Sequence, residues 1–140
     1  MMISTKGRYA LRIMIDLAQN ADETNVPLSD IAKRQEISVK YLEAVIAVLN
    51  KNGFVISKMG KYGGYRLAKE ASDYTVLEIL KTIEGDLSPV ACLKDNENTC
   101  NRADNCITLP MWKEVKNLVS DYFDHITLED LLNGNLKREG

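Results

Sequence analysis

The sequence predicts a mainly α-helical fold that contains one small β-hairpin and a long C-terminal helix. Apolar residues recur at intervals of three and four in several segments, which is typical of amphipathic helices. Residues 54–67 are instead rich in β-forming side chains on both sides of a glycine-rich turn. Residues 109–126 carry an apolar stripe at helical spacing. Together these patterns predict a helical body with a hairpin and a separate long helix.

Length and composition limit the class of protein. At 140 residues, of which 45% are hydrophobic, the chain fits one domain with an appended arm and has ample material for a core. No apolar run approaches the roughly 18 residues that a membrane span requires. The N-terminal pattern, which is interrupted by Lys6, Arg8 and Arg12, lacks the apolar core of a signal peptide. We therefore expect a cytoplasmic protein without a membrane partner.

The net charge of −2 is distributed unevenly along the chain. Residues 1–70 contain 11 Lys/Arg and 7 Asp/Glu, whereas residues 71–140 contain 7 and 13. No acidic side chain lies between Glu43 and Glu70, a stretch that contains five basic ones. A basic front half suits a polyanionic partner on one face, and a solvated charged face is the alternative.

Three helices are predicted before the hairpin. Residues 5–20 form the first, and after a polar loop ending in Pro27, residues 28–35 and 38–53 form a pair joined by only two residues. Ser38 is placed to cap the second helix of the pair and Gly53 to end it. Because so short a joint forces a sharp turn, the pair has the layout of a helix-turn-helix, whose second helix can enter a DNA major groove. The side chains on its first turns, which would reach base edges, are Ser38, Val39, Lys40, Tyr41 and Glu43.

The predicted hairpin comprises residues 54–59 and 65–67 around three glycines that permit positive φ values. A hairpin directly after a recognition helix is a wing, and its basic side chains suit phosphate contact or minor-groove insertion. An ordinary surface hairpin is the alternative. The predicted wing contacts are Lys58, Lys61, Tyr62 and Arg66, and near the N-terminus Lys6 and Arg8 are expected to touch phosphate.

Two short helices and one long helix are predicted after the hairpin. Thr75 opens the first with a capping box and Gly85 closes it, and Thr127 opens a last helix through about residue 133. The stripe of the long helix, residues 109–126, could pack on its own chain or pair with a second copy. We favour pairing, because operator sites are usually read by two-fold dimers. The predicted dimer-interface residues are Trp112, Val115, Val119, Tyr122, Phe123 and Ile126.

The three cysteines, Cys92, Cys100 and Cys106, lie in a segment that cannot build its own core. Leu93 is almost its only apolar residue, and loops of this length are usually functional or disordered. An odd cysteine count without a CxxC pair argues against a disulfide framework. Three thiolates that converge on an Fe–S cluster or zinc would supply the order that packing does not, and reduced bystander cysteines are the alternative.

Four motifs, spread over nearly the whole chain, resemble one family of winged-helix regulators. They are residues 2–12, residues 37–43, the wing glycines with Tyr65, and residues 126–131. The family includes the iron–sulfur cluster regulator (IscR), the nitric-oxide-sensing repressor (NsrR) and the cysteine-metabolism repressor (CymR). The resemblance implies transcriptional control by a homodimer that carries a winged helix-turn-helix at each end and binds a palindromic operator in double-stranded DNA. In cluster-binding members three cysteines before the long helix hold a [2Fe–2S] or related cluster, which implies the same role for Cys92, Cys100 and Cys106.

The chain departs from the cluster-binding members in two ways. The loop between the first two cysteines, seven residues here, is longer than in the iron–sulfur regulator. The histidine that is its fourth ligand corresponds to Leu109, and the aspartate that completes the nitric-oxide sensor corresponds to Arg8. The single histidine of the sequence, His125, lies about four turns further along the predicted helix. An Asp, Glu or Asn of the loop, a residue across the dimer or an exogenous thiol could complete the site.

We therefore predict three parts: a winged helix-turn-helix domain over residues 1–85, a cysteine-containing cluster loop over 86–108, and a dimerisation helix with a short last helix over 109–140. The predicted function is that of a sequence-specific repressor, not an enzyme, that senses iron–sulfur, redox or nitric oxide status. The alternative is a cluster-free regulator of cysteine or sulfur metabolism controlled by a protein partner or by thiol oxidation, because residues 86–90 resemble that branch. A small Fe–S electron carrier is a third possibility. It is remote, because such a protein would not need the acid-free basic wing that this chain has.

Overall fold

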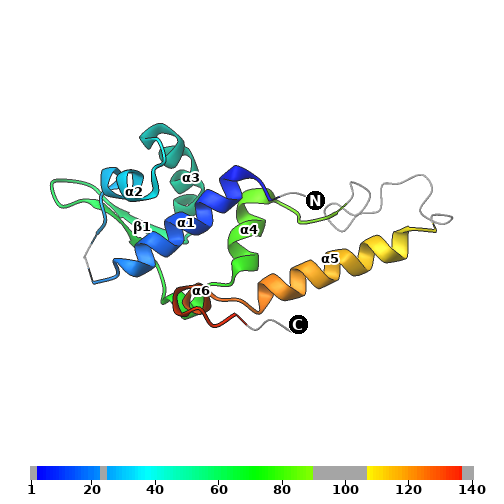
Figure 1. Cartoon of the computed structure of the whole chain (residues 1–140). Helices are drawn as coiled ribbons and strands as arrows, with labels where there is room; N and C mark the ends of the chain where they lie inside the picture. The colour runs from blue at the N-terminus through cyan, green and yellow to red at the C-terminus, as the bar shows by residue number, and fades with distance from the viewer. Residues whose placement is uncertain (1–2, 23–24, 90–106, 137–140) are drawn as a thin grey trace.

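The structure is a computed structural model, and it describes residues 3–22, 25–89 and 107–136. Within those ranges the chain is mainly helical and contains one antiparallel two-stranded hairpin (Figure 1). The elements in chain order are α1 (Thr5–Gln19), α2 (Leu28–Gln35), α3 (Val39–Lys51), β1 (Val55–Lys58), β2 (Gly64–Leu67), the 3₁₀ helix η1 (Ala71–Asp73), α4 (Val76–Glu84), α5 (Leu109–Asp124) and α6 (Leu128–Asn133). The predicted fold class is confirmed.

Helix α1 lies at the centre of the body. It contacts α2, α3, α4, α6 and β2, and its side chains Ile13 and Met14 are fully buried. The apolar face of α3 joins the same core cluster, because the chain spaces its large side chains at intervals of three and four. The buried residues of that face are Leu42, Val45, Ile46 and Leu49, as the sequence predicts.

Hydroxyl side chains cap four of the helices. The Ser4 and Ser38 hydroxyls accept bonds from the backbone N–H groups of Gly7 and Tyr41, at 3.1 and 3.2 Å. Thr75 and Thr127 each form a capping box with the acidic residue three positions on. These bonds satisfy N–H groups that a helix cannot pair internally, so each cap fixes where its helix begins.

A buried carboxylate joins α1 to the end of α2. Asp16 is 1% exposed, and the Arg34 guanidinium donates to its two oxygens at 3.0 and 2.8 Å. The Gln35 amide donates to Oδ2 at 2.9 Å. A buried charge is tolerated when it is paired and fully hydrogen-bonded, so this cluster holds the two helices in one relative position.

The joint between α2 and α3 turns through a left-handed residue. Glu36 has φ 55° and ψ 44°, and the Ile37 N–H donates to the Ala32 carbonyl at 3.1 Å. This conformation reverses the chain within two residues and brings α3 across α2. Glycine adopts this left-handed conformation without steric cost, whereas the Cβ atom of glutamate makes it unfavourable.

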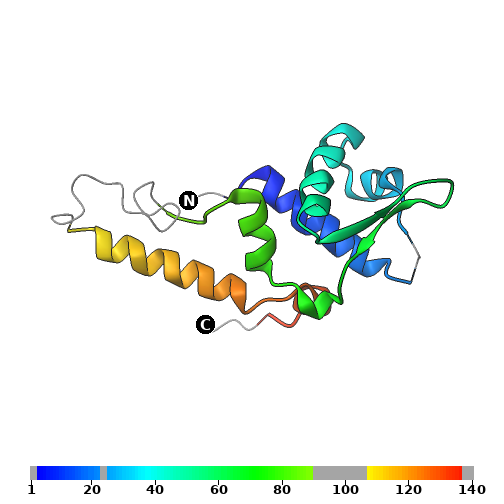
Figure 2. The ribbon, with the colours of Figure 1, turned by 180° about the vertical axis from the view of Figure 1, so that it is seen from behind.

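Helix α5 leaves the body as an arm (Figures 1 and 2). Both views show it extending away from the hairpin, with its C-terminal end beside α4 and α6. The Val76 N–H donates to the Ile126 carbonyl at 2.8 Å, and the Leu128 N–H donates to the Tyr74 carbonyl at 3.1 Å. Backbone pairing therefore fixes the base of the arm to the start of α4. None of the helices in the described ranges is long and apolar enough to cross a membrane.

Candidate nucleic-acid interface

The first turn of α3 is open to solvent on the side opposite the core. Val39, Lys40, Tyr41 and Glu43 are all exposed, with Tyr41 at 36%. The Ser38 hydroxyl is occupied by its cap bond to the Tyr41 N–H, so it is both a cap and a surface group. The five predicted base-reading residues therefore lie together on one accessible surface, at the end of the helix that recognition helices present to DNA.

The hairpin projects beside this surface. Its strands pair in a register that runs from Val55 opposite Leu67 to Lys58 opposite Gly64. Met59 and Tyr62 at the tip are 92% and 79% exposed, and the Lys61 ammonium lies 5.6 Å from the centre of the Tyr62 ring. An apolar side chain, a ring and two lysines on one protruding turn suit contact with phosphates and a groove floor.

Strand β2 of the hairpin is tied to the segment that precedes α2. Val26 forms an antiparallel bridge with Tyr65, with both N–H···O distances at 2.8 Å. Gly64, at φ 149°, lies directly under the Val26 carbonyl, where a Cβ atom would collide with the backbone. Gly64 is therefore required by a close backbone approach as well as by its φ value.

Tyr74 holds the base of the hairpin, at the end opposite the turn. Its fully buried hydroxyl donates to the Phe54 carbonyl at 2.7 Å and accepts the Ala68 and Lys69 N–H groups at 3.0 and 2.9 Å. The rings of Tyr74 and Phe54 meet edge to face at 5.9 Å. Burial raises the pKa of Tyr74, while the two N–H bonds oppose that rise.

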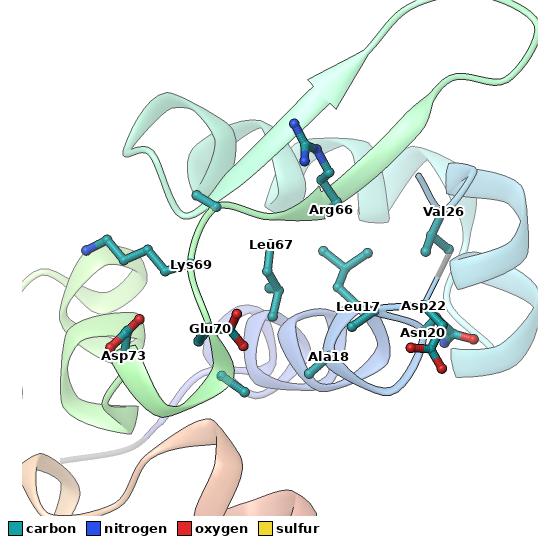
Figure 3. Close-up of a pocket in the computed structure, with 13 residues that line it drawn as sticks. Leu17, Ala18, Asn20, Asp22, Val26, Arg66, Leu67, Lys69, Glu70 and Asp73 are labelled. Atoms are coloured by element: carbon teal, nitrogen blue, oxygen red, sulfur yellow. The ribbon is translucent and has the colours of Figure 1, made fainter. Parts of the chain in front are cut away.

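A hollow of about 720 Å³ lies between the end of α1 and residues 66–73 (Figure 3). Leu67 points from β2 toward α1, where Leu17 faces it, and Arg66 points away from α1. This alternation places Arg66 on the outer face of the hairpin, where its side chain is exposed. The other charged residues around the hollow have mixed signs: Asp22, Lys69, Glu70 and Asp73.

The start of α1 carries the two remaining predicted phosphate contacts. Arg8 is exposed and Lys6 is half-buried. The Glu84 carboxylate of α4 accepts the Ser4 N–H at 3.1 Å and the Ser4 hydroxyl at 2.5 Å, and Gly7 leaves room for that carboxylate. Figures 1 and 2 show the first turn of α3 between the tip of the hairpin and the start of α1. The predicted DNA contacts thus come from three elements on one side of the body.

The apolar stripe of α5 is only partly covered. Trp112, Val115, Val119 and Phe123 are half-buried, and Tyr122 is 50% exposed. Ile126 differs from the rest of the predicted interface. It is buried against its own chain in a cluster with Val76, Leu80 and Leu87. Two further apolar side chains of the helix, Met111 and Leu118, are exposed and extend the open edge of the stripe.

The three cysteines, Cys92, Cys100 and Cys106, lie outside the described residues. The flanks of their segment are described: Leu87 is buried, and Asp86 pairs with Lys116 of α5 at 3.5 Å. Leu109 is buried, and the His125 imidazole contacts the Asp121 carbonyl at 2.5 Å. Among the described residues no three His, Cys, Asp or Glu side chains gather as a metal site.

Comparison with known proteins decides the family. The model of the Rrf2 family, described as an iron-dependent transcriptional regulator, matches residues 3–134. The chain belongs to the Rrf2 family. The HTH-type transcriptional regulator IscR of Pectobacterium atrosepticum is 36% identical over 133 residues, which cover 95% of this chain and 80% of that protein.

Solved structures of Rrf2 relatives have the same fold. CymR of B. subtilis, a global cysteine regulator, matches at 37% identity with a TM-score of 0.79, over 96% of this chain and 98% of that one. IscR of T. potens matches at 37% identity with a TM-score of 0.76, over 100% and 94%. The resemblance inferred from the four sequence motifs is confirmed.

Membership of the Rrf2 family establishes the general function. The chain is a transcriptional regulator with the helix-turn-helix of a DNA-binding protein, and its relatives are named as regulators rather than enzymes. The prediction of a regulator without enzymatic activity is confirmed at that level. Cluster sensing, dimerisation and the individual contact residues stay predictions.

Proposed function

We propose that two copies of this chain form a dimer that reads a two-fold symmetric operator, with α3 in the major groove and the hairpin in the adjacent groove. The observation that carries this proposal is the arrangement of three elements. The exposed first turn of α3 lies between the lysine-bearing hairpin tip and the start of α1 in both views of the body. Base contacts would supply specificity, and the lysines would supply phosphate affinity.

The side chains of α3 divide into different kinds of contact. Lys40 and Tyr41 can donate hydrogen bonds to base acceptors or phosphate, and Val39 can contact a thymine methyl. The Glu43 carboxylate can accept from a cytosine amino group and repels sites that place an acceptor there. This division predicts that Glu43→Ala relaxes specificity at one base pair, whereas loss of a wing lysine weakens binding to every sequence.

Dimerisation would use α5. Met111, Leu118 and Tyr122 expose apolar surface along the arm, on a helix whose main contact with its own body is α4. An exposed apolar helical face is stable in water when a second copy covers it. Two bodies joined through their arms would present two copies of α3, as a palindromic operator requires.

The wing assignment is tested by the salt dependence of DNA binding. We expect Lys58→Ala/Lys61→Ala to weaken binding to random duplex DNA and to make the plot of log affinity against log salt less steep. The slope should change by about 0.9 for each phosphate that the variant no longer neutralises. The matched control is Lys113→Ala, an exposed lysine on α5. An unchanged slope in the double variant, or an equal change in the control, would contradict the assignment.

We further propose that Cys92, Cys100 and Cys106 hold a [2Fe–2S] or related cluster through which the regulator receives its signal. The donor set fits, because thiolates are the usual ligands of such clusters. When bound, a cluster supplies chemistry that responds to oxidants and nitric oxide. The flanks of the segment would transmit the change between the cluster-bound and cluster-free states to the body. The contacts involved would be those of Leu87 with the apolar cluster around Ile126 and the Asp86–Lys116 pair.

The fourth ligand would come from elsewhere than the long helix. Leu109 is apolar and buried, and His125 lies about 24 Å further along α5 at 1.5 Å per residue. The proposal is tested by the visible spectrum with iron and sulfide analysis of anaerobically purified protein, beside Cys92→Ala. Broad visible absorption with iron and sulfide in stoichiometric amounts, absent from the variant, is the expected result.

A colourless protein that cannot be reconstituted would favour the second candidate. This is a cluster-free regulator controlled by a protein partner or by thiol oxidation. The buried Leu109 and the match to CymR over nearly the whole chain support this candidate. The DNA-binding proposal is unaffected by that choice, because it depends on α1, α3, the hairpin and the arm and not on the cysteine segment.

A further inference from the structure

We propose that Tyr9 and Arg12 of α1 are positioning residues that fix the Tyr41 side chain of α3 in the conformation that reads DNA. The inference rests on the proposed function, because Tyr41 is one of the predicted contact residues. Neither Tyr9 nor Arg12 was expected to contribute to recognition. The pairing has no direct signal in the sequence, since 32 positions separate Tyr9 from Tyr41.

The first step is the contact between the two tyrosine rings. The centres of the Tyr9 and Tyr41 rings are 5.4 Å apart, and the ring planes meet at 89°. An edge-to-face pair at this distance is favourable beyond the area it buries. Tyr9 is half-buried and packs on the core, so the fixed ring supports the exposed one.

The second step is the support beneath Tyr9. The Arg12 guanidinium lies 5.1 Å from the centre of the Tyr9 ring, in position for a cation–π contact. Arg12 Nε donates to the Gln35 side-chain oxygen at 3.1 Å, and Nη2 donates to the Gln35 backbone carbonyl. The guanidinium is therefore held at three points, which leaves it little freedom to move away from the ring.

The third step connects this support to the buried carboxylate. The Gln35 amide nitrogen donates to Asp16 Oδ2 at 2.9 Å, and Asp16 also accepts two bonds from Arg34. Gln35 is thus fixed at both ends of its amide. A continuous set of contacts runs from the buried Asp16 through Gln35, Arg12 and Tyr9 to Tyr41 at the surface.

Holding Tyr41 in one rotamer lowers the entropy cost of binding. A free side chain at an interface loses conformational entropy when DNA fixes it, whereas a side chain that is already positioned does not. Specific contacts require the hydroxyl at one place, and phosphate contacts tolerate displacement. The contacts that position Tyr41 should therefore raise the affinity for specific sites and leave the affinity for nonspecific DNA unchanged.

The positioning of Tyr41 is measured without DNA. In protein with ¹³C-labelled tyrosine rings, we expect the ring current of Tyr9 to shift the Tyr41 resonances, which are assigned with Tyr41→Phe. Tyr9→Leu is expected to move them toward random-coil values, while Tyr9→Phe keeps them. Unmoved resonances in Tyr9→Leu would overturn the proposal.

The effect on recognition is measured on an operator that the unaltered chain selects from a random duplex library. We expect Tyr9→Leu to lower the ratio of operator affinity to random-duplex affinity about three- to tenfold, and Tyr9→Phe to leave it unchanged. In a Tyr41→Ala background, Tyr9→Leu should have no further effect on the ratio. The matched control is Leu11→Ala, which removes half-buried packing from the opposite side of α1.

The outcomes separate this inference from the proposed function. A ratio that falls equally in Leu11→Ala, or additive effects of Tyr9→Leu and Tyr41→Ala, would overturn the positioning role alone. Failure of the unaltered chain to enrich any duplex would overturn the proposed function and the inference with it.

Discussion

The body and the arm of this molecule differ in what completes them. In the body, α1 and α3 bury their apolar faces within one chain, and a buried carboxylate and a buried tyrosine hydroxyl find all their partners there. Along α5, by contrast, Leu118 is 60% exposed and Leu109 is the helix's only buried residue. The part that faces DNA therefore folds from its own contacts, whereas the arm presents apolar surface suited to a second copy.

This difference predicts that the free energy of unfolding has two parts, one independent of protein concentration and one dependent on it. A change in the body should alter the free energy of unfolding at any protein concentration. A change on the open edge of α5 should alter only the part of the stability that depends on concentration, because association contributes by mass action.

The largest effect is expected in the core of the body. Leu49 is fully buried in the cluster that joins α1 and α3. Leu49→Ala should lower the free energy of unfolding by about 3 kcal/mol, because apolar burial is reduced and a cavity is left behind. Urea unfolding at two protein concentrations measures this. A loss that appeared only at the higher concentration would contradict the assignment of Leu49 to a self-contained core.

A smaller loss is expected at the base of the hairpin. Tyr74→Phe leaves two N–H groups and one carbonyl without their shared partner, which should cost about 2 kcal/mol. The pKa of Tyr74 is raised above its ordinary value of 10.0 in the folded chain, so the unfolded chain ionises first. Its contribution is therefore complete below pH 10.0 and is lost as the pH rises through the raised value.

Unfolding measured between neutral and alkaline pH tests both parts of this prediction. The unaltered chain should lose stability above pH 10.0 more steeply than the Phe variant, which lacks the titrating hydroxyl. Parallel pH profiles for the two proteins would contradict it.

A gain is expected at the turn between α2 and α3. Glu36 adopts the left-handed region at φ 55°, which glycine occupies freely. Glu36→Gly should raise the free energy of unfolding by about 0.5–1 kcal/mol, measured by thermal unfolding. Gly is the sharper probe here than Ala, because Ala keeps the Cβ atom that opposes this conformation. A gain in Glu36→Ala of equal size would show that the backbone conformation is not the cause.

The smallest effect on the body is expected from the arm. Leu118→Glu places a charge on the open apolar edge of α5, where it should abolish association. In dilute solution the free energy of unfolding should stay within about 0.5 kcal/mol of the unaltered chain. Sedimentation equilibrium measures the mass, and Lys113→Glu is a control for adding an acid to the same helix. A dimer that persisted in Leu118→Glu would contradict the proposed interface.

Much of the fold follows from local patterns that the sequence displays. The helix boundaries at Ser4, Ser38, Thr75 and Thr127 follow from hydroxyl caps, and the buried face of α3 follows from spacing. The hairpin follows from β-forming residues around glycines. The proposed DNA contacts could be predicted as a group, because they flank these local elements.

The remaining features arise from contacts between residues far apart in the sequence. From the sequence alone, Asp16 would be expected on the surface of its helix. It is instead buried, because Arg34 and Gln35 at the end of α2 donate hydrogen bonds to its carboxylate. The bridge between Val26 and Tyr65 joins a loop to a strand across 39 positions of the sequence. Ile126 fits the α5 stripe by spacing, but its place at the base of the arm buries it against α4. Local patterns carry no information about such partners.

The bridge between Val26 and Tyr65 has a consequence for DNA geometry. Because it ties the hairpin to the segment that leads into α2, the hairpin tip and the reading surface of α3 keep a fixed separation. The two contacts can therefore engage only sites that lie at one fixed distance along the duplex. One added base pair lengthens the axis by about 3.4 Å, so a half-site with an insertion between the two contacts no longer fits the span.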